Sequence, residues 1–374
     1  MPDLPELLKT ALHSRHLAAG ATMTDEAGWD MPLSYRGAIE EVRAVRTRAG
    51  VMDVSHLGRL RIRGAGAAEL LERLCTADVA HQEDNTARLT LLCSQTGGII
   101  DQCYLLRPEG FWVLLTSPCN RLKVLEHVRS HAGDFDAKVD DQTEKTSMLS
   151  VTGPQAPAIL DAVLPEKASQ TPAGAVRVGS LLIAKYIVMR TGYSGEWGLE
   201  AVVPNMAAGM AWDFITKKAG PNAAPPIGMA ARDVLRIEAG LPRYGHEINE
   251  TIDPITAGLE GLVDFSHEFL GREAVMQHRE RPAARRRVGL VVGGDVAEQS
   301  VIPRQGAVVL RTDGGEAGTV TSGTYSPTLD KVIAMAYVGA DAAEAGTELL
   351  VQVGAERRQT HVVELPFHRG SARA

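Results

Sequence analysis

Residues Thr191 to Glu200 read TGYSGEWGLE, and this stretch argues against a nucleotide-binding fold. Its glycines have the spacing G-x-x-G-x-x-G, whereas a dinucleotide-binding turn requires G-x-G-x-x-G between a strand and a helix. Glycine at every third position costs a helix roughly 1 kcal/mol each relative to alanine. The stretch therefore predicts a turn that leads into a strand, with Glu200 on that strand.

The segments around this turn show both strand and helix patterns. Residues 89–106 form two apolar runs around a Ser-Gln-Thr-Gly-Gly stretch, which predicts a hairpin, and residues 111–117 supply a further strand before a helix over 120–131. Helical spacing also marks residues 4–20 and 66–78. The region up to about residue 280 is therefore predicted to be α+β.

The pattern changes after a basic run, Arg285 to Arg287. Short apolar segments follow at nearly regular spacing, with turn residues between them. This arrangement is typical of a small barrel or sandwich. We predict two domains, 1–280 and 281–374, joined by a linker at residues 278–287.

Composition excludes several classes of function. The 374 residues carry a formal net charge of −7, which disfavours a nucleic-acid surface, and no run of 18 apolar residues is present, which disfavours a membrane protein. The four cysteines lack a Cys-x-x-Cys pair, neither His-Glu dipeptide has a second histidine at i+4, and no G-x-S-x-G occurs. We expect a cytoplasmic protein without a metal site or a nucleophilic serine.

Three charged residues are candidates for catalytic or ligand-binding roles. Asp101 ends the stretch GGIID inside an apolar strand, where a carboxylate is costly unless it is partnered or used; the alternative is an edge position facing solvent. Glu200 shares its strand face with Gly198 and Val202, which favours a ligand rich in donors, although a solvated pair with Glu196 is equally compatible. Arg232 lies on an amphipathic helix that ends near Gly240, where charged residues are expected to pair along the surface.

Read together, these segments resemble the aminomethyltransferase family, the T-protein of the glycine cleavage system. The matching segments are AGWDMPLSY, VMDVSHLG, GGIID, RTGYSGEWGLE, ARDVLRIEAGLPRYGHEI, FLGREA, GTVTSGTYSP, IAMAYV and LPF, in order from about residue 12 to residue 367. The resemblance implies a three-lobed, cloverleaf-like α+β protein. Two interwoven α+β lobes would be followed by a C-terminal β-barrel as the third lobe, with tetrahydrofolate bound in the central channel.

The resemblance also implies site residues and a reaction. Glu200 would accept the donors of the pteridine ring, Asp101 would act as the catalytic acid near the folate amines, and Arg232 would meet the anionic end of the ligand. Tyr193 would pack near the ring. An aminomethyl group would pass from a lipoylated H-protein to tetrahydrofolate with release of ammonia.

Five positions depart from the usual family text: Glu26, Leu57, Leu89, Gln102 and Ser117. Leu57, Leu89 and Ser117 replace methionine, tyrosine and asparagine that would border the folate, so we count them as ligand-binding positions. The departures leave room for a folate-dependent demethylase. A folate-binding accessory protein is disfavoured because its K-G-C-Y-x-G-Q-E signature is absent, and the folate domain of a dimethylglycine or sarcosine oxidase would need a separate flavin-binding partner chain.

Overall fold

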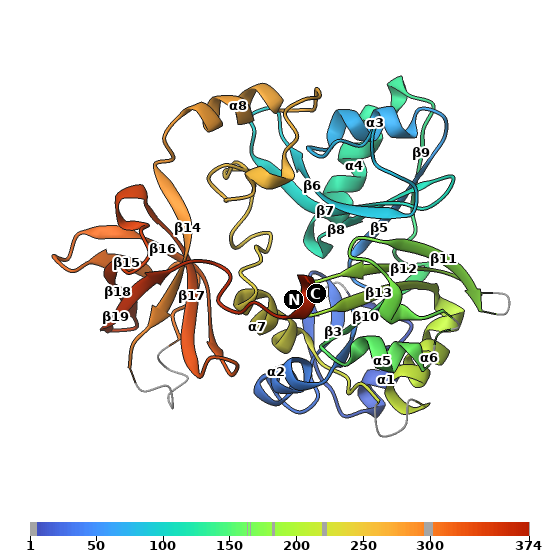
Figure 1. Ribbon diagram of the computed structural model, residues 1–374, viewed down its shortest axis with the longest axis horizontal. Coiled ribbons are helices and arrows are strands. Elements are labelled where there is room, and N and C mark those ends of the chain that lie inside the picture. Colours follow the sequence, from blue (N-terminus) through green and yellow to red (C-terminus); the bar gives the residue numbers. More distant parts are fainter. Residues whose placement is uncertain are drawn as a thin grey trace.

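Three lobes meet at the centre of the computed structural model, which describes residues 6–162, 164, 166–181, 184–218, 223–294 and 302–373 (Figure 1). Two α+β lobes lie side by side, and a β-barrel forms the third lobe (Figure 1). Helix α7 (Met229–Glu238) lies between the barrel and the second lobe (Figure 1). The predicted three-lobed α+β fold is confirmed.

The first lobe is built on a five-stranded antiparallel sheet of order β6-β7-β8-β5-β9. Helices α3 (Ala67–Leu74) and α4 (Arg121–His131) pack on it because each carries an apolar stripe at helical spacing, including Leu70, Leu74, Val124 and Val128. The strands are β5 (Gly58–Arg63), β6 (Thr86–Cys93), β7 (Ile99–Arg107), β8 (Trp112–Thr116) and β9 (Lys138–Asp141). The predicted hairpin is β6 and β7.

The second lobe is built on a sheet of order β11-β12-β13-β10-β4, which is covered on both faces. Helices α5 (Ala156–Asp161) and α6 (Asn205–Asp213) pack on one face, and α2 (Ala38–Thr47) and α7 pack on the other. The strands are β4 (Gly50–Asp53), β10 (Thr146–Thr152), β11 (Val176–Leu181), β12 (Ala184–Thr191) and β13 (Gly198–Pro204). The TGYSGEWG stretch is the turn between β12 and β13, as predicted.

The two α+β lobes are interwoven because the chain crosses between their sheets twice. Strand β4 belongs to the second sheet and the following strand, β5, to the first. The chain crosses back between β9 and β10. An apolar cluster that includes Leu106 and Leu115 of the first lobe and Met148 and Met189 of the second joins the two sheets.

The predicted helix over residues 4–20 is wrong for most of its length. Residues 4 and 5 lie outside the described part of the chain, and within residues 6–20 only α1 (His13–Ala18) is helical, although the chain does turn at Gly20. Residues Leu8–Lys9 instead form β1, which pairs with β3 (Trp29–Ser34), and β2 (Thr22–Glu26) completes a small sheet. Backbone pairing with a distant strand has overridden the local helical spacing.

The barrel closes in the order β14-β17-β16-β15-β18-β19. Its interior is filled by alternate residues such as Val288, Leu290 and Val292, and outward-facing Ile333 and Met335 pack on Ile237 of α7. The strands are β14 (Arg285–Val292), β15 (Val308–Arg311), β16 (Glu316–Ser326), β17 (Lys331–Gly339), β18 (Glu348–Val353) and β19 (Glu356–Val363). Of the two predicted architectures, barrel and sandwich, the structure forms the barrel.

The predicted linker is shorter than expected. Helix α8 (Arg272–Glu280) continues to Glu280, and β14 already begins at Arg285, so residues 281–284 connect the lobes. Helical and strand hydrogen bonds take up both ends of the predicted linker. Within the described ranges, no helix is long and apolar enough to cross a membrane.

Candidate functional site

A cavity of about 410 Å³ lies where the two α+β lobes meet, bordered also by the loop after α7. Its wall combines residues of β6, β7 and β8 from the first lobe with residues of β13, α7 and the β12–β13 turn from the second. Six residues that the sequence assigns to a ligand are in this wall: Leu57, Leu89, Ser117, Tyr193, Glu200 and Arg232. Residues separated by 175 positions are thus brought to one site.

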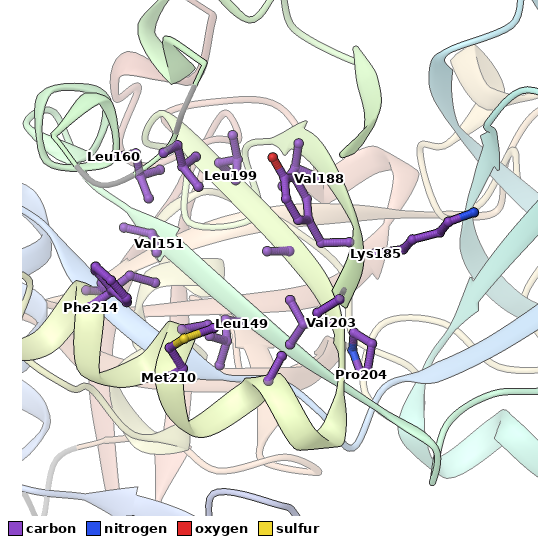
Figure 2. Close-up of a pocket in the computed structure, with 17 residues that line it drawn as sticks. Leu149, Val151, Leu160, Lys185, Val188, Leu199, Val203, Pro204, Met210 and Phe214 are labelled. Atoms are coloured by element: carbon purple, nitrogen blue, oxygen red, sulfur yellow. The ribbon is translucent and has the colours of Figure 1, made fainter. Parts of the chain in front are cut away.

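The two faces of β13 border two different cavities, because successive side chains of a strand point to opposite faces of the sheet. Glu200 faces the cavity between the lobes, whereas Leu199 and Val203 line a separate cavity of about 130 Å³ between the second sheet and its helices. Figure 2 shows the apolar side chains around this second cavity, with Lys185 pointing away from them. The described lining of the second cavity offers almost no polar atoms, so it provides few groups for catalysis.

Glu200 is a buried acid in the middle of a sheet. Its strand neighbours are Ser150 and Met189, and its side chain is 6 % exposed. Burial raises the pKa of Glu200 to about 7, although the charge of Arg232 and a hydrogen bond from Thr191 act in the opposite direction. The carboxyl group therefore changes its charge near neutral pH, and a ligand that donates hydrogen bonds to it would favour the ionised form.

The solvated pair of Glu196 and Glu200 is excluded. Glu196 is 4 % exposed and forms its own ion pair with Arg46, at 3.0 Å between Nη1 and Oε1. It also accepts hydrogen bonds from Ser371 of the segment after the barrel. Burial would raise the pKa of Glu196, but its hydrogen bonds to His368 and Ser371 and the charge of Arg46 lower that pKa to about 2.

Tyr193 and Arg232 form a stacked pair in the cavity wall. The guanidinium carbon of Arg232 lies 3.9 Å from the centroid of the Tyr193 ring. The turn that carries Tyr193 closes with a hydrogen bond from the Gly195 amide to the Gly192 carbonyl, and Gly195 has φ +81°, where a side chain would be strained. Within the described residues Arg232 forms no ion pair, so its charge is available to an anion.

Asp101 lies next to the cavity but does not line it. It is fully buried on β7, between β6 and β8, so the alternative of a solvent-facing edge position is wrong. Its carboxylate accepts hydrogen bonds from the backbone amide of Ser117 at 2.8 Å and from the side-chain amide of Asn120 at 3.2 Å. Burial raises the pKa of Asp101 despite these hydrogen bonds. Asp101 thus reaches the cavity wall through Ser117.

Several wall residues were missed by sequence reasoning. Tyr104 lines the cavity beside Gln102, because alternation along β7 turns both away from the Asp101 side. Arg243 also lines it and pairs with Glu26 at 2.6 Å and with Asp233 at 3.4 Å. Alternation from Asp101 could have indicated Tyr104, but only the tertiary fold places Arg243 opposite Glu26.

The pairing expected along α7 is found between Arg236 and Asp233, at 2.9 Å, but the expected exposure of these charged residues is wrong for Arg236 and Glu238. Arg236 and Glu238 are 1 % and 0 % exposed. Arg236 pairs with Glu247 at 2.7 Å, and Glu238 pairs with Arg46 at 2.7 Å. These ion pairs are buried because the barrel and α2 both pack on this helix. Among the described residues, no group of three or more His, Cys, Asp or Glu side chains could hold a metal ion.

The sequence matches two family models in tandem. Residues 12–267 match the GCVT N-terminal domain, and residues 285–368 match the glycine cleavage T-protein C-terminal barrel domain. The chain belongs to the glycine cleavage T-protein family. All the cavity residues discussed above lie within the first match.

Relatives across the T-protein family are similar over nearly their whole length. The aminomethyltransferase of Streptomyces coelicolor is 40% identical over 373 residues, covering 97% of this chain and 98% of that protein. The aminomethyltransferase of Thermotoga neapolitana is 35% identical, covering 98% and 99%. The crystal structure of the glycine cleavage system aminomethyltransferase T from Bartonella henselae has a TM-score of 0.89 and 29% identity, covering 98% of this chain and 99% of that one. The chain is therefore an enzyme of the aminomethyltransferase family.

Proposed function

We propose that this protein transfers an aminomethyl carbon from the lipoyl arm of H-protein to tetrahydrofolate in the cytoplasm. The observation that carries the proposal is the buried carboxyl group of Glu200 in a cavity that also presents Arg232. A folate has donor groups on its pteridine ring and carboxylates at its other end. The cavity offers an acid for the first and a cation for the second.

Glu200 would recognise the pteridine. The 2-amino group and the adjacent ring N–H are two parallel donors, and an ionised carboxylate accepts such a pair in a bidentate geometry. Leu57 and Leu89 would contact the ring through apolar surface. Binding would draw the ionisation equilibrium of Glu200 toward the carboxylate, because only that form accepts both donors.

Arg232 would meet the benzoyl-glutamate end of tetrahydrofolate. The second arginine in the wall, Arg243, is already paired with Glu26 and Asp233, whereas Arg232 is stacked on Tyr193. A guanidinium group binds a carboxylate in a planar, bidentate manner. Stacking on Tyr193 would hold the guanidinium group in place for that contact.

The reaction needs positioning and proton transfer rather than a covalent enzyme intermediate. The carbon loses its bonds to the lipoyl sulfur and to the amine nitrogen, and it gains two bonds to folate nitrogens. The two protons leaving those nitrogens go to the thiol and to ammonia. We propose that Asp101 orients the folate amines at the part of the cavity wall formed by Ser117. Ser117 and Asn120 hold its carboxylate.

An equilibrium titration with tetrahydrofolate tests the binding half of this proposal. Glu200→Ala should weaken binding by at least about tenfold, because it removes an acceptor for two charge-assisted hydrogen bonds. Glu316→Ala, an exposed acid on the barrel, is the matched control and should bind like the parent protein. An unchanged dissociation constant in Glu200→Ala would reject the pteridine role.

A second candidate function differs in the one-carbon donor and in the group transferred, which would be methyl. The five positions that depart from the family text, Glu26, Leu57, Leu89, Gln102 and Ser117, all border the same cavity. Such clustering favours an altered ligand set, and a folate-dependent demethylase acting on a small methylated compound is the corresponding reaction. Incubation with tetrahydrofolate and a panel of methylated amines and sulfonium compounds, with methyltetrahydrofolate as the readout, would detect it.

A further inference from the structure

The segment after the barrel returns to the turn that carries Tyr193. Residues 364–372, which we call the strap, leave β19 and reach the centre of the molecule beside the second lobe (Figure 1). The amide of His368 donates to the Glu238 carbonyl at 2.8 Å, and the amide of Ala372 donates to the Gly195 carbonyl at 3.0 Å. The strap therefore connects the barrel to α7 and to the turn.

Glu196 is the centre of these contacts. Its Oε2 accepts hydrogen bonds from the Ser371 amide at 2.9 Å and from the Ser371 hydroxyl at 2.6 Å, and its Oε1 lies 3.1 Å from Nε2 of His368. The Ser371 hydroxyl in turn accepts from the Trp197 amide at 3.0 Å. A Cβ at Gly370 would collide with the Glu196 carboxylate, so the strap needs glycine for this approach.

The same network holds the two elements that carry the stacked pair. Arg46 donates to Glu196 at 3.0 Å and to the Ser194 carbonyl at 2.7 Å, next to Tyr193 in the chain. It also donates to Glu238 at the end of α7, the helix that carries Arg232. The outer side of the turn is thus bound by the strap and Arg46, while its inner side places Tyr193 in the cavity.

We propose that Glu196, held by the strap, is a positioning residue for the folate site. It fixes the β12–β13 turn so that Tyr193 lies under Arg232, and it thereby sets the affinity of the cavity without contacting the ligand. This inference rests on the proposed function. It assigns the strap a role in ligand affinity, beyond closing the barrel onto the second lobe.

Two substitutions at one residue separate this role from a purely structural one. Ser371→Ala removes both hydroxyl hydrogen bonds, and Ser371→Thr keeps a hydroxyl group at the same position. In Ser371→Ala, amide hydrogen exchange over residues 192–197 should rise, and the dissociation constant for tetrahydrofolate should rise by about threefold to tenfold. Ser371→Thr should restore both. Turnover at saturating folate should stay near the parent value, since the reacting groups are unchanged.

Controls make the outcomes decisive. Ser169→Ala removes an exposed serine–carboxylate hydrogen bond, to Asp161, in the same lobe and should change neither measurement. If Ser371→Ala folds poorly, Glu196→Gln, which keeps the side-chain shape, replaces it. Glu196→Gln should show the same rise in amide exchange and in the dissociation constant. Faster exchange with an unchanged dissociation constant would overturn the proposal, as would loss of affinity that Ser371→Thr does not restore. If the parent protein itself fails to bind tetrahydrofolate, the proposed function is wrong and the strap proposal fails with it.

Discussion

The ionisation of Glu200 is the residue-level property on which the proposed recognition of tetrahydrofolate depends. Burial without a paired cation favours the neutral acid, so the ligand-free protein holds a proton at this position up to about pH 7. In the proposed complex, the hydrogen-bond donors of the pteridine would reverse that preference. Ligand binding would thus offset the energetic cost of burying the acid.

Stability without ligand should depend on the titration of Glu200. Its folded pKa, about 7, lies above the ordinary value of 4.5, so the stabilising contribution is complete below about pH 4.5 and is lost as pH rises through 7. The difference amounts to about 3 kcal/mol at most. The free energy of unfolding, measured with denaturant, should therefore fall more steeply between pH 5 and pH 8 for the parent than for Glu200→Gln. Parallel curves would show that Glu200 titrates normally.

Asp101 should affect turnover more than binding. Asp101→Asn keeps the shape of the side chain, but it removes the charge and leaves one acceptor oxygen for two donors, the Ser117 amide and the Asn120 side-chain amide. We expect turnover to fall by about a hundredfold and the dissociation constant for tetrahydrofolate to stay near the parent value. Asp140→Asn, in an exposed pair with Arg63, is the control. Parent-like turnover in Asp101→Asn would reject its catalytic assignment.

The acids of the TGYSGEWGLE stretch illustrate how far sequence reasoning reaches at this scale. The glycine spacing predicts the turn, and period-two alternation correctly places Glu200 on one face with Gly198 and Val202. Neither pattern reports that Glu196 is buried against Arg46, because its partners come from α2 and from residues beyond the barrel. Local chemistry predicts the candidates, and the tertiary contacts decide between their alternatives.

At the scale of elements, the positions of strands were predicted better than the burial of charged residues on helices. Strands β6, β7, β8 and β13 and the barrel strands follow from apolar patterns and turn residues, whereas β9 and β11 were not predicted. Helix α7 was correctly placed, but its charged positions were assigned to solvent, since an amphipathic helix is expected to have one polar face. In the structure α7 packs on the barrel as well as on the second lobe, so part of its polar face is buried.

The buried pair between Arg236 of α7 and Glu247 of the following loop should be important for stability. Glu247 is fully buried, and its carboxylate accepts hydrogen bonds from Arg236, Thr321 and Ser322, which join α7 to β16. Glu247→Ala leaves the Arg236 charge buried without this partner, and we expect the free energy of unfolding to fall by about 3–5 kcal/mol. Asp341→Ala, which breaks an exposed pair with Arg311 on the barrel, should change it little. Equal effects of the two substitutions would contradict the buried-network interpretation.

At the scale of the whole molecule, the cavity exists only because the lobes are assembled. The first lobe contributes Leu89 and Ser117, the second contributes Glu200 and Arg232, and residues after α7 close the wall. The crossing of the chain between the two sheets has no local pattern of its own, so only the family resemblance indicated it. The strap adds a contact from the barrel to the outer side of the same site.

The most direct test of the proposed function is a turnover assay with purified protein, tetrahydrofolate and aminomethyl-loaded H-protein. Methylenetetrahydrofolate and ammonia should be measured together in the same reaction. We predict that both form in equal amounts and that formation depends on the protein. Binding of tetrahydrofolate without either product would contradict the glycine-cleavage reaction and would leave the demethylase as the candidate.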